Sequence, residues 1–171
     1  MQNNSKFEKM TQAPVEKLIC TLALPTIISM MISTIYNTAD TYFAGKINTN
    51  AVAAIGIAYS FMSIIQAFGF WYGHGSGNFI SRMLGKKNLE DAESMASLGL
   101  LFSICTGIIF AICTVIFGEY IAIILGGNEL IKEDIVSYLK MLSFGIPFIM
   151  GGLTLNNQFR YQGNALLGMI G

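Results

Sequence analysis

The chain has 171 residues, of which 53% are hydrophobic and only 12% are charged. A soluble domain usually carries about 25% charged residues, so this composition argues against a water-soluble fold and favours a membrane protein. The basic and acidic side chains balance to a formal net charge of zero. The charge therefore gives no basis for binding nucleic acid or an acidic partner.

The charged residues are clustered and leave four charge-free runs, each near or above the roughly 20 residues that a spanning helix needs. These runs cover 18–39, 47–81, 94–118 and 141–159. We therefore predict an all-α integral membrane protein, a multi-helix transmembrane bundle with the lipid bilayer as its surroundings. Its spans are expected at about 18–41, 51–81, 94–118 and 135–157, and a fifth helix is expected to begin at about 163.

Asp40 is the only charged residue between Lys17 and Lys46. An ionised carboxylate is costly in hydrocarbon, and charged residues within spans usually mark a path for protons, ions or substrates. This position favours a transporter. The alternative is that Asp40 is solvated at the outer end of its helix, because Lys46 follows only six residues later.

Polar residues of the first span recur at helical spacing and so share one face of the helix. They are Ser29, Ser33, Tyr36, Asn37 and Asp40. We expect this face to turn toward the bundle interior or a water-filled cavity, where Tyr36, Asn37 and Asp40 could form an ion or proton site. Pro25 removes a backbone hydrogen bond in the same span, which commonly kinks or softens a helix.

The second run contains a row of small residues, with Gly69, Gly73 and Gly77 spaced four apart. Such a row lets another helix approach closely. His74 lies in the same region and could titrate near neutrality. For His74 we favour packing or a hydrogen bond to a neighbouring helix over metal binding, because no second ligand stands at helical spacing.

The fourth run is rich in helix-breaking residues and ends in two asparagines. The breakers are Gly145, Pro147, Gly151 and Gly152. Irregular backbone is tolerated at membrane depth only where protein or water satisfies it, so this density predicts an irregular helix lining a cavity. Asn156 and Asn157 are possible lining residues, and a position at the cytoplasmic interface is the alternative.

The distribution of basic residues predicts the orientation. Those on one side are Lys6, Lys9 and Lys17 before the first span, Arg82, Lys86 and Lys87 after the second, and Arg160 after the fourth. By the positive-inside rule we expect the N-terminus and the 82–93 loop to be cytoplasmic. A cleaved signal peptide is the competing interpretation of residues 1–40, but its apolar core would be too long.

Cysteine usage adds one constraint. Cys20, Cys105 and Cys113 lie in apolar stretches without a CxxC pair, so neither a disulfide framework nor a metal site is indicated, and we expect them to be packing residues. Together with the absence of a cleavable signal, this fits a multi-pass protein of a bacterial inner (plasma) membrane.

Three segments of the chain resemble the start of the multidrug and toxic compound extrusion (MATE) family of antiporters. They are LALPTIISMMISTIYNTADTYFAGKINTNAVAAIGIAYSF, GHGSGNFISRMLGKKNLEDAESMA and LNNQFRYQGNALLGMIG. The resemblance implies a twelve-helix transporter with two six-helix lobes. Such a protein exports cationic or amphipathic drug-like compounds against entry of protons or sodium, without a cofactor and without enzymatic activity.

The resemblance also assigns roles to particular residues. Asp40, within IYNTAD, matches the cation-coupling aspartate of the first helix, with sodium as a possible ligand. Tyr36 would neighbour that site, and Pro25 matches the proline at which bending of the first helix has been proposed. Residues 1–171 would then form part of the N-terminal lobe, and the missing C-terminal portion of the same protein would be its partner.

Other functions remain open at this point. A lipid-linked oligosaccharide flippase of related architecture would need cationic residues in its cavity, whereas the first four spans hold one acid and no base. A truncated, non-transporting membrane fragment is another alternative. An intramembrane enzyme is disfavoured, because no nucleophile–base pair or metal-ligand cluster stands out in the sequence.

Overall fold

The computed structural model describes residues 14–47, 49–128 and 131–164, and nearly all of them are helical. The helices are α2 (Val15–Ile47), α3 (Thr49–Gly85), α4 (Leu89–Ile124), α5 (Lys132–Ser143) and α6 (Ile146–Tyr161). No β-strand occurs in these ranges. The expected all-α fold is thus confirmed for the described residues, while the twelve-helix, two-lobed architecture stays a prediction.

Three of these helices are long and apolar enough to cross a membrane. The apolar stretches are Ile19–Phe43 in α2, Val52–Gly85 in α3 and Leu89–Ile124, which is the whole of α4. Helices α5 and α6 pass the same test only as a pair, and they are bent by 55° at a short break. The described part of the chain therefore holds three candidate spans, or four if the bent pair is one span.

The break between α5 and α6 has a local cause. Pro147 lies in the first turn of α6, where its missing N–H costs no helical hydrogen bond, and Gly145 occupies the capping position before it. The irregularity expected in the fourth run is confirmed at Gly145 and Pro147, whereas α6 runs unbroken through Gly151 and Gly152, and the expected lining of a cavity stays a prediction. The fifth helix expected from about 163 falls largely on 165–171, outside the described residues.

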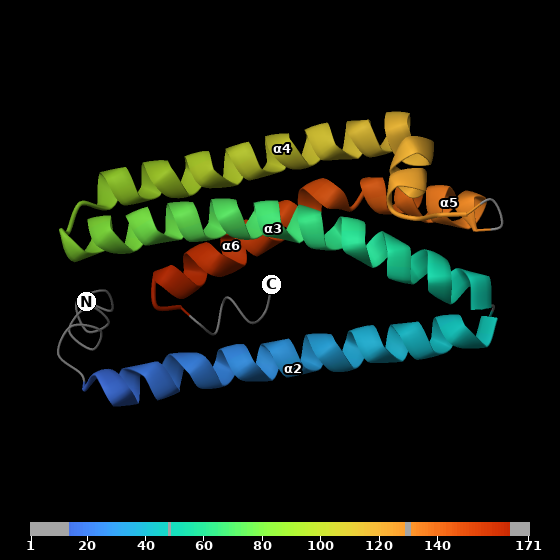
Figure 1. Cartoon of the computed structure of the whole chain (residues 1–171). Coiled ribbons are helices and arrows are strands. Elements are labelled where there is room, and N and C mark those ends of the chain that lie inside the picture. The colour runs from blue at the N-terminus through green and yellow to red at the C-terminus, as the bar shows by residue number, and fades with distance from the viewer. Residues whose placement is uncertain (1–13, 48, 129–130, 165–171) are drawn as a thin grey trace.

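The small residues of α3 form its contact with α6. A methyl group placed on Gly69 would lie 3.1 Å from a Leu153 methyl carbon, and one on Gly73 would lie 2.8 Å from Cβ of Asn157. Figure 1 shows α6 running alongside α3 and α4. The expected close approach of another helix is confirmed, and that helix comes from the other end of the chain.

Helix α4 contributes a second row of small buried residues, Gly99, Ser103 and Gly107. A methyl group on Gly107 would lie 2.7 Å from Cα of Pro147, so the backbones of α4 and α6 approach very closely. Small residues allow such approach in membranes, where van der Waals packing between helices largely drives association. Helices α3, α4 and α6 thus form one tightly packed unit.

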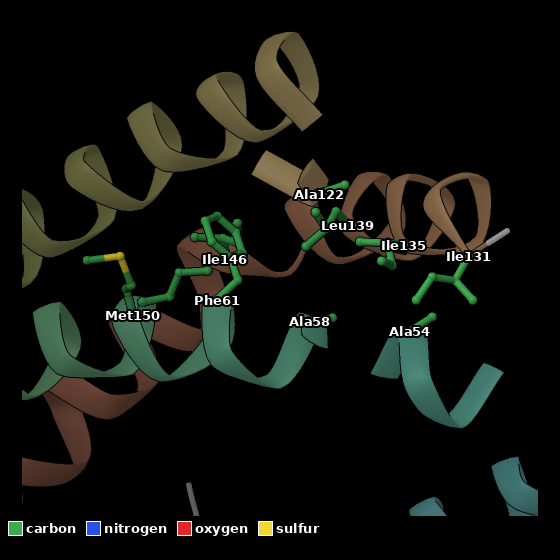
Figure 2. Packing of buried hydrophobic residues seen from close by; sticks show 10 residues of the cluster. Ala54, Ala58, Phe61, Ala122, Ile131, Ile135, Leu139, Ile146 and Met150 are labelled. Atoms are coloured by element: carbon green, nitrogen blue, oxygen red, sulfur yellow. The ribbon is translucent and has the colours of Figure 1, made fainter. Parts of the chain in front are cut away.

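A hydrophobic cluster fills the end of the bundle where α5 lies, and Figure 2 shows how its side chains converge. Helix α3 contributes Ala54, Ala58, Phe61 and Ile65, and α4 contributes Ala122. The other members are Ile131, which precedes α5, Ile135 and Leu139 of α5, and Ile146 and Met150 of α6. The small alanines of α3 leave room for the isoleucines and leucine of α5.

The remaining surfaces are strongly apolar. No described side chain of α2 is buried, and the largest exposed rings include Trp71 and Phe148, at 70% and 81% exposure. Surfaces of this kind suit the bilayer. Cys20, Cys105 and Cys113 are free and exposed, so their expected packing role was wrong within the described structure.

Candidate functional site

The polar strip expected to carry ion coupling lies on α2. Ser33, Tyr36 and Asn37 are exposed in the described structure, Tyr36 at 69%. The side chains of Asp40 and Pro25 lie outside the described part of the structure, although the backbone of α2 runs as one helix through both positions. The proposed bending at Pro25 stays a prediction.

The threonines of α2 differ from the residues of the polar strip in how their side-chain hydrogen bonds are satisfied. Thr34, Thr38 and Thr41 each donate their hydroxyl hydrogen to the backbone carbonyl four residues earlier, at 2.8–2.9 Å. These hydroxyls need no water in an apolar medium. An asparagine amide and an aspartate carboxylate have more hydrogen-bonding capacity than one such bond uses, so Asn37 and Asp40 require water, an ion or another helix.

A first polar junction joins three helices inside the bundle. Thr154 of α6 is fully buried, and its Oγ1 atom lies 2.8 Å from Oγ of Ser103 in α4 and 3.4 Å from the carbonyl oxygen of Gly69 in α3. It also lies 2.9 Å from the Met150 carbonyl of its own helix. This hydroxyl therefore links α6 to both of its neighbours.

A second junction lies one turn further along α6. Nε2 of Gln158 donates to Oγ of Ser76 in α3 at 3.0 Å and to the carbonyl oxygen of Ala96 in α4 at 3.1 Å. Sequence reasoning missed both junctions. The available signal was the spacing of four between Thr154 and Gln158, which matches the small-residue rows of α3 and α4.

His74 contacts the end of α6, as expected. Its Nδ1 atom lies 3.2 Å from the Tyr161 hydroxyl, and the two rings meet edge to face with centroids 5.9 Å apart. The predicted hydrogen bond to a neighbouring helix is confirmed. Tyr72 and Thr106 form a comparable pair between α3 and α4, with their oxygens 2.8 Å apart.

The two asparagines expected as lining residues differ in their surroundings. Asn157 is only 3% exposed, packs against Gly73 and donates from Nδ2 to the Leu153 carbonyl at 2.8 Å. Asn156 is half-buried. The structure therefore places Asn157 inside the contact between α3 and α6, and it does not bring it together with Tyr36 or Asn37 of α2.

Among the described residues, no group of three or more His, Cys, Asp or Glu side chains is placed to hold a metal ion. An ion pair joins Lys132 Nζ to Glu119 Oε2 at 2.9 Å and so links the start of α5 to the end of α4. The candidate site is thus the polar strip on α2, which the described structure leaves exposed and does not join to the polar junctions between α3, α4 and α6.

Comparison with known proteins assigns the chain to a family. A family model described as MatE matches residues 25–170. Multidrug export protein MepA of Staphylococcus aureus strain MSSA476 is 30% identical over 166 residues, covering 96% of this chain and 36% of that protein. The protein of the same name from Staphylococcus haemolyticus strain JCSC1435 is 29% identical over 161 residues, covering 94% and 36%.

No solved structure matches the chain significantly. The chain spans 36% of the length of these curated relatives, so it corresponds to one part of them. The family model nevertheless covers most of the chain, including α2 from residue 25 onward and the whole of α3, α4, α5 and α6. The chain therefore belongs to the MATE (multidrug and toxic compound extrusion) family.

Proposed function

We propose that this chain is the N-terminal part of a transporter that exports cationic or amphipathic compounds in exchange for protons or sodium ions. The observation that carries the proposal is the match of almost the whole chain to proteins named multidrug export protein MepA. The apolar candidate spans and the polar strip on α2 support it. Polar and ionisable side chains within a span cost free energy in a bilayer, and where they occur they usually mark the path of an ion or a substrate.

In this proposal Asp40 is the coupling residue, and Tyr36 and Asn37 are its neighbours on the strip. Binding of a proton or sodium ion neutralises the carboxylate, which changes how α2 packs and weakens binding of the exported compound. Pro25 lets α2 bend, and Ser33 extends the polar lining toward it. The membrane potential contributes about 2.3 kcal/mol for each charge moved through 100 mV.

We further propose that the N-terminus faces the cytoplasm and that the protein resides in the plasma membrane. The start of α2, the turn between α3 and α4 and the end of α6 lie at the same end of the bundle (Figure 1). Arg82, Lys86, Lys87 and Arg160 belong to that end, and basic residues are retained on the cytoplasmic side of membranes.

The test is Asp40→Asn in the protein as the gene encodes it. Efflux of a cationic dye from energised vesicles should be lost, while the amount of protein in the membrane stays unchanged. Thr38→Ala is a matched control on the same helix, because the Thr38 hydroxyl is exposed and satisfied by Thr34. Dye export by the Asp40→Asn variant at the wild-type rate would remove Asp40 from coupling.

A further inference from the structure

The outward face of the segment formed by α5 and the start of α6 changes character along its length. Its first half exposes polar side chains, namely Glu133, Asp134, Ser137 and Lys140. Its second half exposes large apolar ones, namely Met141 at 81%, Phe144 at 80% and Phe148 at 81%. The change occurs between two consecutive residues, Lys140 and Met141.

The rotation of α5 about its own axis is fixed by the opposite face. Ile135 and Leu139 are fully buried in the cluster that also holds Ala54 and Ala58 of α3 (Figure 2). Because both side chains are 0% exposed, this contact determines which face of α5 turns outward. The exposed polar and apolar residues of α5 therefore cannot exchange places with the buried face.

The start of α5 lies beside the polar end of α4. The charge-free run of α4 ends at Gly118, and its backbone leaves helical geometry at Phe117, with φ −106° and ψ 16°. Glu119 follows and pairs with Lys132 at 2.9 Å. Figure 1 shows α5 at the end of the bundle where α2 ends and α3 begins.

The chain after Lys140 covers most of the hydrocarbon core without the first two turns of α5. The charge-free run 141–159 has a helical length of roughly 28 Å at 1.5 Å per residue, against ~30 Å for a bilayer core, and the 55° bend before α6 shortens its span somewhat. We infer that the hydrocarbon boundary crosses α5 between Lys140 and Met141. From the sequence we had expected the fourth span to start earlier, at about residue 135.

In this arrangement residues 132–140 lie in the headgroup layer, and Met141, Phe144 and Phe148 contact the acyl chains of lipids. The acyl chains are the occupant because three neighbouring apolar side chains are each about four-fifths exposed and follow directly after the exposed charges of the first half of α5. Lys140 and Tyr138 stand at the junction, where a cation meets lipid phosphate and a tyrosine ring suits the interface.

The first test uses single cysteines in the protein as the gene encodes it, with Cys20, Cys105, Cys113 and any cysteine encoded outside residues 1–171 replaced by alanine. Ser137→Cys should react with a membrane-impermeant maleimide at least about tenfold faster than Phe148→Cys, because only a hydrated thiol ionises readily. Both positions are exposed on the same segment, so they form a matched pair. Equal reaction of the two would overturn the proposed boundary.

The second test separates lipid from protein as the occupant. Phe144→Trp is introduced together with Trp71→Phe and with phenylalanine at any tryptophan encoded outside residues 1–171, and the protein is reconstituted in vesicles whose acyl chains carry bromine. Tryptophan fluorescence at position 144 should be quenched more strongly than that of a Ser137→Trp variant in the same background. Quenching no stronger than at position 137 would mean that another part of the protein covers this face, and the assignment to lipid would fail.

Discussion

Nε2 of Gln158 in α6 lies 3.0 Å from Oγ of Ser76 in α3, and the same amide nitrogen reaches the Ala96 carbonyl of α4 at 3.1 Å. One side chain therefore links three helices. We predict that Gln158→Leu lowers the free energy of unfolding by about 1 kcal/mol, in the range measured for hydrogen bonds between membrane helices.

Thermal denaturation in detergent would check the Gln158 prediction. Ser97→Ala is the control, because the Ser97 hydroxyl is exposed and donates only to the Glu93 carbonyl of its own helix. Its midpoint should equal that of the unmodified protein. A Gln158→Leu midpoint at or above the wild-type value would show that the amide is not a stabilising link.

Thr154 and Thr114 allow a matched comparison of two fully buried hydroxyls. Thr154 bonds to Ser103 of another helix, whereas the bond found for Thr114 goes to the Phe110 carbonyl of its own helix. Thr154→Val should therefore destabilise the protein by roughly 0.5–1.5 kcal/mol, and Thr114→Val should have a smaller effect. Denaturation in a titrated detergent mixture would measure both, and equal losses would contradict the prediction.

Gly107 and Gly152 test close helix packing. A Cβ atom on Gly107 would meet the Pro147 backbone at 2.7 Å, whereas one on Gly152 meets nothing within 4 Å. Gly107→Ala should cost about 1–3 kcal/mol through overpacking. Gly152→Ala should be neutral or slightly stabilising, because alanine is the better helix former. Thermal midpoints of the purified variants in one detergent would measure both effects. An unchanged midpoint for Gly107→Ala would contradict the close packing of α4 against α6.

Tyr161 combines a ring contact with a hydrogen bond. Tyr161→Phe keeps the ring against Gly77 and removes the bond to His74, so only about 0.5–1 kcal/mol should be lost. Tyr161→Ala also removes the ring and should cost more. A double-mutant cycle with His74→Ala, followed by thermal denaturation, measures the pair directly. A coupling energy of zero would show that the two side chains act independently.

The sequence predicted the long helices well, because charge-free runs and helical periodicity are local properties. The charge-free run 94–118 falls within α4 and the run 47–81 lies in α3 from Thr49 onward, and the row of glycines around Gly73 correctly indicated a close helix neighbour. The identity of that neighbour could not be predicted, because the pairing of Gly73 with Asn157 joins residues far apart in the chain.

The candidate site was predictable in kind but not in its contacts. Periodicity alone places Ser33, Tyr36 and Asn37 on one face of α2, and the structure leaves that face exposed. The buried contacts of Thr154 and Gln158 were not predictable, because threonine and glutamine are common residues in a helix near the membrane surface. Their importance arises only when α6 packs against both α3 and α4.

The position of α6 has a consequence for biosynthesis. Its hydrogen-bond partners in α3 and α4, Gly69, Ser76 and Ser103, are separated from it by 85, 82 and 51 residues. Membrane helices insert individually before they associate. These groups of α3 and α4 therefore lack their α6 partners until α6 has been translated, so nascent chains that stop before α6 should be substrates for membrane quality-control proteases.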